Sequence, residues 1–356
     1  MLNIDDITHP EGDKRYRIAN ADGKVWVCPT RNLRTAMELY QPSGRNGRLL
    51  KLLLPHLHRL APVRRIAHTS TLSASLHPEI IEAARRAFGT DALEYSIFGG
   101  TPSVHRKITI QFHRDKRILG YAKLTDSKEI KQLFRHEQQL LESLQKCGIS
   151  GIPKCLECGQ LPSGRYIFIQ TTAKTLKSYS PDRWTPLHEE FLSRLASKTA
   201  VDVAFEDSDF ARSLRQLEDA LPNIPEEYRN TIANALKAVW DHYTATIPRF
   251  SAFHADFTPW NMFVTDGHLF VFDWEYARLT YPPMLDRYHF HVQQAIHVGH
   301  LPADEIRREI ESQPWYDPID FRSYLLDIIS RFVGRENGRI SPSLDAMLSV
   351  WAKLLK

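Results

Sequence analysis

Short apolar runs separated by polar residues dominate residues 94–172 and predict β-strands there. Lys107-Ile-Thr-Ile-Gln-Phe112 alternates apolar and polar side chains, as a half-buried strand does. The apolar run at 120–124 has the length of a short buried strand. From residue 173 onward the apolar positions are spaced by three and four, for example at 228–243, which predicts helices. A strand-rich part is therefore followed by a helical part.

One helix is predicted inside the strand-rich part, and a charged residue interrupts its apolar stripe. Asp126-Ser-Lys-Glu129 has the composition of a helix start. The apolar positions that follow are Ile130, Leu133, Phe134, Leu140, Leu141 and Leu144. Glu137 lies on the same stripe, where a carboxylate is costly unless it is paired. We expect Lys123, on the preceding strand, to be its partner; the alternative is that Glu137 lies at the stripe edge and reaches water.

The first 93 residues add further elements before this part. The pattern predicts a hairpin at 15–28, a helix at 33–40 and a helix at 78–88 that has proline in its first turn. Residues 48–65 are rich in leucine, with basic residues interleaved. They fit either a segment that lies on a membrane surface or a helix buried against neighbouring structure. We expect the buried helix.

Residues 251–276 carry the clearest chemical signal. Asp256 and Asn261 lie five residues apart in a loop that a Pro-Trp pair keeps from being helical. Two apolar runs follow, and Thr265-Asp-Gly-His268 separates them, which predicts a β-hairpin. The hairpin would return Asp273 to the neighbourhood of Asn261. Oxygen ligands gathered in this way suit a hard divalent cation beside a phosphate chain.

The wording of this stretch, His254-x-Asp256-Phe-x-Pro-Trp-Asn261 followed by Asp273-Trp-Glu, resembles the aminoglycoside phosphotransferase and choline kinase family of the protein-kinase-like fold. The resemblance implies that Asp256 is the catalytic base and that Asn261 and Asp273 bind Mg²⁺ at the phosphates of ATP. It also implies that Lys123, oriented by Glu137, holds the α- and β-phosphates. The alternative is a surface loop beside an ordinary hairpin.

The same resemblance implies two further nucleotide contacts. Gly99 and Gly100 would form the bend of a strand–loop–strand unit over the phosphates, and Thr101 and Ser103 in the same bend are further candidates for contact with them. A buried strand at 166–171 would enter the hinge, where groups of Gln170 and Thr171 would contact adenine.

Composition limits the remaining possibilities. A hydrophobic fraction of 42% and a charged fraction of 25% are those of a globular protein. Residues 1–170 carry 26 Lys and Arg against 16 Asp and Glu, a net charge of +10, whereas the remainder carries 20 against 26, a net charge of −6. The basic half suits phosphates or an anionic membrane surface, and since no nucleic-acid motif accompanies it we expect no nucleic-acid partner. Four cysteines and no secretory leader favour a cytoplasmic protein.

These observations and the resemblance together predict an α+β, bilobal protein-kinase-like fold with a small antiparallel N-lobe at 94–172, a helical C-lobe at 173–356 and an appended N-terminal subdomain at 1–93. The predicted reaction is transfer of the γ-phosphate of ATP to a hydroxyl group of a small molecule, with a sugar or saccharide intermediate slightly favoured. Two alternatives stay open: an aminoglycoside or amino-alcohol kinase, and an inactive kinase-like protein that binds a nucleotide or a partner. A protein kinase is disfavoured because no long segment ending in Ala-Pro-Glu follows Asp273.

Overall fold

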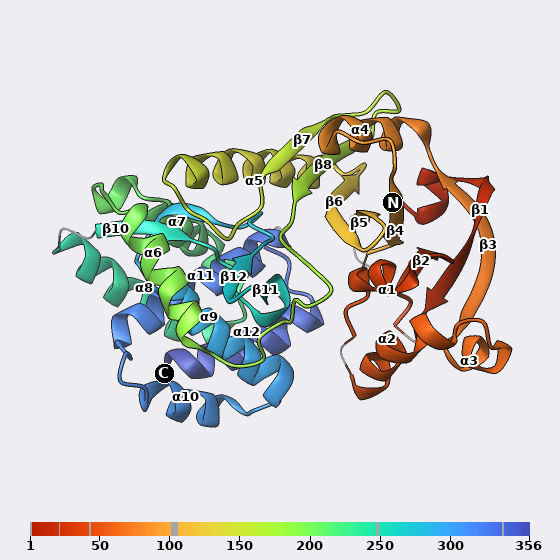
Figure 1. Ribbon diagram of the computed structural model, residues 1–356. Helices are drawn as coiled ribbons and strands as arrows, with labels where there is room; N and C mark the ends of the chain where they lie inside the picture. The colour runs from red at the N-terminus through yellow and green to blue at the C-terminus, as the bar shows by residue number, and fades with distance from the viewer. Residues whose placement is uncertain (1, 21, 43, 101–105, 247–248, 337) are drawn as a thin grey trace. The chain divides into compact units, whose positions relative to one another are not determined.

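The computed structural model describes residues 2–20, 22–42, 44–100, 106–246, 249–336 and 338–356. Contacts divide the chain into two compact units (Figure 1). Unit 1 runs as far as Glu142 and includes Ile152–Ser178, and unit 2 comprises Ser143–Gly151 and Tyr179–Lys356. Strands predominate in the first and helices in the second, which confirms the predicted fold class.

Among the described residues of unit 1, eight antiparallel strands form a single sheet in the order β3-β1-β2-β4-β5-β6-β8-β7. The strands are β1 (Thr8–Ala19), β2 (Val25–Pro29), β3 (Thr69–Leu76), β4 (Glu94–Phe98), β5 (Ile108–Arg114), β6 (Arg117–Thr125), β7 (Cys155–Gln160) and β8 (Tyr166–Thr171). Trp26 of β2 pairs with Phe98 of β4, so the strands before residue 93 continue the sheet of those after it. The domain boundaries at 93 and 172 remain predictions.

Helices and loops cover both faces of this sheet. On one face, α4 (Pro78–Phe88) buries Ile80 against strand residues that include Ile110 and Ile169. On the other, α1 (Leu33–Ala36), the turn at Met37–Leu39 and α2 (Arg45–Leu57) pack on Tyr16 and Trp26. The long helix α5 (Lys128–Lys146) places Phe134 beside Phe168 of β8, with 5.7 Å between the ring centroids.

The leucine-rich segment at 48–65 differs from its expected burial. It forms α2 and the short α3 (Ala61–Ile66), and Leu54 is fully buried in the core beneath α2. Leu52 and Leu60, in contrast, are 65% and 54% exposed. The prediction of a buried helix is therefore wrong for the side of the segment that carries Leu52 and Leu60. Apolar content alone does not determine whether other elements of the fold pack against a helix.

Unit 2 is a helical body around a large apolar core that unites α7, α8, α11 and α12. Its helices are α6 (Pro186–Lys198), α7 (Asp209–Ala220), α8 (Glu226–Thr244), α9 (Leu285–Gln294), α10 (Ala303–Glu311), α11 (Pro318–Arg335) and α12 (Pro342–Leu355). Its strands are β9 (Val201–Asp202), β10 (Arg249–Phe253), β11 (Met262–Thr265), β12 (His268–Val271) and β13 (Arg278–Tyr281). Short turns of helix lie at Ile4–Ile7 in unit 1 and, in unit 2, at Phe205–Asp207, Leu221–Asn223, Pro259–Asn261 and Ala295–Gly299. None of the helices that the structure describes has the length and apolar character needed to cross a bilayer.

Candidate active site

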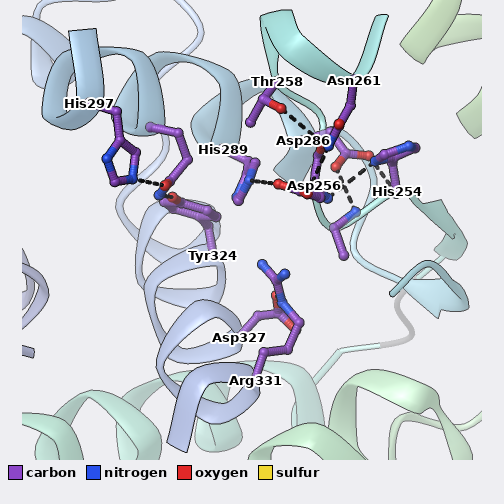
Figure 2. Close-up of polar contacts among 12 residues, drawn as sticks. His254, Asp256, Thr258, Asn261, Asp286, His289, His297, Tyr324, Asp327 and Arg331 are labelled. Atoms are coloured by element: carbon purple, nitrogen blue, oxygen red, sulfur yellow. Dashed lines mark hydrogen bonds and ion pairs between the residues drawn. The ribbon is translucent and has the colours of Figure 1, made fainter. Parts of the chain in front are cut away.

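The loop after β10 is held by a buried carboxylate on the next helix. Asp286, in the first turn of α9, accepts the backbone N–H of His254 at 2.8 Å and that of Ala255 at 3.0 Å (Figure 2). Ala255 needs this support because its φ of 71° lies in the left-handed region, which costs a residue with a Cβ ~1–2 kcal/mol. Burial raises the pKa of Asp286 to about 7, while the two N–H groups oppose that rise. Asp286 thus braces the loop.

His254 ties the same loop to the end of the hairpin. Its Nε2 donates to the carbonyl of Phe272 at 3.1 Å, and its Nδ1 accepts the N–H of Asp256 at 3.2 Å. Burial lowers the pKa of the imidazole to about 4, so the ring is neutral near pH 7 and keeps one donor and one acceptor. The ring also packs edge-on against Trp274, with 4.4 Å between the centroids. His254 therefore braces the loop backbone from inside.

Asp256 is held at both carboxylate oxygens. Oδ2 accepts the side-chain amide of Asn261 at 2.7 Å, and Oδ1 accepts Nε2 of His289 at 3.2 Å (Figure 2). Burial opposes ionisation, but the hydrogen bond from His289 outweighs it and lowers the pKa of this carboxyl below its ordinary value. The side chain remains 33% exposed. Asp256 is therefore an oriented, ionised carboxylate that solvent can still reach.

The predicted hairpin is present and returns the chain as expected. Met262 pairs with Val271 and Thr265 with His268. Asp266 and Gly267 form the turn with φ values of 48° and 78°, the two positive angles that a type I′ turn requires. The N–H of Phe272 donates to the carbonyl of Asn261 at 3.0 Å, which brings the residue before Asp273 beside the loop that carries Asp256.

The donor groups of this site fit a magnesium ion. Both hydrogen bonds from Asn261 Nδ2 run to Asp256, to the carbonyl at 3.0 Å and to Oδ2 at 2.7 Å, so the Asn261 amide presents its oxygen elsewhere. Asp273 supplies a carboxylate from a left-handed backbone with a φ of 68°. Carboxylate and amide oxygens are the ligands that Mg²⁺ prefers. Asn261 and Asp273 would hold the cation, and strained backbone at such a position is typical of functional sites.

In unit 1, the expected pair of Lys123 and Glu137 is formed. Lys123 Nζ on β6 lies 2.8 Å from Glu137 Oε2 and 3.2 Å from Oε1 on α5. The Glu137 side chain is fully buried and that of Lys123 is 9% exposed. The ammonium also lies 5.6 Å from the centroid of the Phe168 ring. The alternative, a glutamate at the stripe edge that reaches water, is wrong.

The glycine bend follows β4 and can be assessed at two positions. Gly100 has a φ of 78°, and a Cβ there would lie 2.2 Å from the carbonyl oxygen of Lys107, so only glycine fits. The Gly99 carbonyl accepts Arg106 Nε. Thr101 and Ser103 lie outside the described residues. A phosphate-binding role for this bend stays a prediction.

Two residues near the predicted hinge, Thr171 and Gln170, differ in whether their polar groups already have hydrogen-bond partners. The N–H of Thr171 donates to the carbonyl of Lys154 at 2.9 Å and is already used in the sheet. Gln170 is buried, and its Oε1 has no hydrogen-bond partner within the described chain. Gln170 and Phe168 are two residues apart on β8, so both side chains lie on the face of the sheet that carries Lys123. The Gln170 side chain is the stronger candidate for an adenine contact.

His289 is a residue of the candidate site that the sequence did not reveal. His289, His291, His297 and His300 all read as ordinary helix-face residues, yet His289 contacts the predicted base directly. Burial lowers its pKa, so a neutral ring donates Nε2–H to Asp256 and leaves Nδ1 without a hydrogen-bond partner among the described residues. Its spacing of three from Asp286 places both on one face of α9, the face directed at the loop. This spacing of three was the sequence signal that could have placed His289 beside the loop.

A second line of polar groups surrounds this loop. Arg331 and Asp327 on α11 form a buried ion pair at 2.9 Å, and Tyr281 donates to Asp327 at 2.9 Å. Figure 2 shows Arg331 extending from α11 toward the catalytic loop. Its positive charge acts on Asp256 from inside the unit, and the two carboxylates in turn raise the pKa of Arg331 against the effect of burial. The field at the loop therefore favours a charged Asp256.

Comparison with known proteins gives a match over part of the chain. Residues 128–285 match the phosphotransferase enzyme family. The matched range contains the loop that carries Asp256 and Asn261 and the hairpin that leads to Asp273, and the expected resemblance is confirmed. The sequence matches no curated protein.

Solved structures give the fold. A thermostable mutant of aminoglycoside phosphotransferase APH(4)-Ia with ADP and hygromycin B aligns over 78% of this chain and 97% of its own, at 13% identity and a TM-score of 0.50. Aminoglycoside 2'-phosphotransferase-IIIa with GDP aligns over 78% and 99%, at 14% identity and a TM-score of 0.49. A proposed fructosamine-3-kinase of Haemophilus somnus 129PT aligns over 78% and 97%, at 12% identity and a TM-score of 0.48. The first of these supports the kinase-like fold of aminoglycoside phosphotransferases, and at this identity it supports the fold alone.

Proposed function

We propose that this chain is an ATP- and Mg²⁺-dependent phosphotransferase that moves the γ-phosphate to a hydroxyl group of a small molecule. The observation that carries the proposal is the setting of Asp256. A surface aspartate needs neither a buried histidine on one oxygen nor an asparagine amide on the other. Holding both oxygens fixes the direction of the remaining lone pairs, which is what a base that receives a hydroxyl proton requires.

Each residue of the proposed site has a separate task. Asp256 orients the acceptor hydroxyl and takes its proton as the new O–P bond forms and the bond to the leaving ADP oxygen breaks. Lys123, held by Glu137, contacts the α- and β-phosphates, and Asn261 and Asp273 hold the cation. When bound, Mg²⁺ neutralises negative charge on the phosphates. Catalysis of this kind consists mainly of positioning and electrostatic stabilisation.

The acceptor class is proposed from unit 2. A cavity of about 590 Å³ lies there between Asp182, His291, Gln294 and Glu309. Its volume suits a sugar-sized molecule, and its amide and carboxylate groups are partners for hydroxyl groups. The turn at Ala295–Gly299 borders this cavity and also carries His297, which contacts Trp260 of the catalytic loop at 6.1 Å between the ring centroids. We favour a sugar or saccharide intermediate as acceptor.

Aminoglycosides and amino alcohols are the principal competitors, since hygromycin B is bound in one of the similar structures. The experiment is a measurement of ADP release with Mg·ATP against a panel of neutral sugars, sugar phosphates, amino alcohols and aminoglycosides. The proposal expects acceptor-dependent turnover for at least one neutral sugar or sugar derivative. Turnover with cationic acceptors alone would move the assignment to an aminoglycoside or amino-alcohol kinase. Nucleotide binding without turnover on any acceptor would favour an inactive nucleotide-binding protein.

A further inference from the structure

An apolar stripe on α2 and α3 faces solvent. Of the twelve large apolar side chains that are exposed among the described residues, six lie between residues 49 and 66. They are Leu49, Leu52, Leu53, Leu57, Leu60 and Ile66, and we call them the leucine stripe. Ile66 is 80% exposed. The other six are scattered along the chain, so this concentration is particular to the segment.

The stripe is not the inner face of the helix. Leu54 is fully buried and Leu50 packs partly against the same core, so α2 already meets the sheet of unit 1 with one apolar side. With about 100° between successive helix positions, Leu49 and Leu53 fall on a separate line of α2, outside that contact. A surface helix normally presents polar residues on this side. Nothing in the packing of unit 1 requires leucine at these positions.

The charged residues of the segment that carries the stripe have one sign. Residues 39–78 contain no aspartate or glutamate, whereas they contain Arg45, Arg48, Lys51, Arg59, Arg64 and Arg65. Arg48, Arg59 and Arg65 are exposed. Lys51 is paired with Glu38 at 3.0 Å, and Arg64 donates to the carbonyls of His58 and Arg59, where it holds the turn between α2 and α3. The exposed charge within this segment is therefore purely basic.

We propose that the leucine stripe and its arginines dock unit 1 on an anionic phospholipid surface. A helix with leucine on one side and arginine along its edge lies in the interface plane, where the leucines enter the acyl boundary and the arginines meet the headgroups. The 13 residues of α2 are too few to span a bilayer, so the segment would lie on the membrane and not cross it.

A bilayer suits these residues better than a protein partner does. The centres of protein interfaces are enriched in tyrosine, tryptophan and methionine, and leucine is under-represented among residues that dominate binding. The stripe contains aliphatic side chains alone. An anionic surface also complements a stretch of forty residues without a carboxylate, since Lys and Arg near such a surface each contribute ~1 kcal/mol. The proposal does not depend on the phosphotransferase activity.

The test is co-sedimentation of the intact chain with vesicles. One set contains phosphatidylcholine alone and the other about one third phosphatidylglycerol, at low and at high salt. We expect binding to the anionic vesicles alone, and weaker binding at high salt. Arg59→Glu with Arg65→Glu should lower the affinity about 25-fold or more, because each lost arginine removes a factor of about five. Leu52→Glu should lower it at least tenfold, since it places a carboxylate in the acyl boundary.

Matched control variants distinguish an effect of the leucine stripe and its arginines from the effect of changing any exposed arginine or leucine. Arg117→Glu changes an exposed arginine at the β5–β6 turn, and Leu156→Glu changes an exposed leucine on β7. Both should bind anionic vesicles within about twofold of the unaltered chain, and all variants should keep its melting temperature because the altered side chains are exposed. Absence of sedimentation with anionic vesicles overturns the proposal, and so does equal loss in the control variants. A dimer in solution that Leu52→Glu dissociates, without lipid binding, would assign the stripe to a second copy of the chain.

Discussion

Replacing Glu137 by alanine should destabilise unit 1 by ~3–5 kcal/mol, the range for removing one partner of a buried ion pair. The geometry places the effect in that range: both carboxylate oxygens lie within 3.2 Å of the Lys123 ammonium, and the glutamate side chain is fully buried. The 9% exposure of Lys123 lets water compensate part of the loss, so we expect a value nearer 3 kcal/mol. The variant should also use ATP less well, since Lys123 loses the group that orients it.

Urea unfolding of the intact chain measures this change, with hydrogen exchange of the β6 amides to report unit 1 separately. Glu142→Ala is the control, because Glu142 is exposed on the same helix and should change stability by less than about 0.5 kcal/mol. The double variant Lys123→Met, Glu137→Leu should recover most of the stability, since an apolar pair of similar volume often replaces a buried ion pair at little cost. A loss below about 1 kcal/mol in Glu137→Ala, or no recovery in the double variant, would refute the reasoning.

Three further predictions concern the remaining groups. Asp273→Asn should weaken Mg²⁺-dependent nucleotide binding more than Asn261→Ala, because it removes the ligand that carries formal charge. A Mg²⁺ titration that gives the reverse order would contradict the assignment of these two residues as Mg²⁺ ligands. His289→Leu should lower kcat about tenfold or more at unchanged KM for ATP, because it removes the hydrogen bond to Asp256. His289→Gln, which retains a donor, should recover part of the lost kcat. Equal effects of the two variants would show that His289 only packs in the core. Burial lowers the pKa of Lys174 to about 8 from 10.5, so the unfolded chain binds more protons between these values and stability should rise with pH across that window by up to about 3 kcal/mol. Lys174→Met should abolish that rise in urea unfolding at pH 8 to 10, and an unchanged slope would show that Lys174 titrates normally.

Local patterns predicted the parts of the site that depend on short-range geometry. Asp266 and Gly267 specify a tight hairpin turn, and the hairpin then determines the position of Asp273. Glu137 was identifiable because a carboxylate on an apolar helix stripe demands a cation, and Lys123 was the nearest basic residue on a strand. In both cases a small number of residues encodes the constraint.

Long-range arrangement was harder to predict for a physical reason. The pairing of Trp26 with Phe98 joins strands about seventy residues apart, and pairing between distant strands leaves no periodic signal in either strand. His289 contacts Asp256 across 33 residues, and its helix pattern alone could not say which face meets the loop. The leucines of α2 have the composition of a buried helix, but burial also requires a covering partner. Contacts of this kind depend on the packed chain.

The assignment of Asp256 is tested most directly by phosphoryl transfer in Asp256→Asn, measured beside Mg·ATP binding. The acceptor is the one identified by the panel, or water where slow ATP hydrolysis is the readout. We expect nucleotide affinity close to that of the unaltered chain and transfer reduced by ~10²-fold or more, the usual scale for loss of a general base. Thr265→Ala, which alters the hairpin at a distance from the carboxylate, serves as the control and should keep nearly full activity. Turnover by Asp256→Asn within a few-fold of the unaltered chain would remove Asp256 from the mechanism and with it the proposed phosphotransferase site.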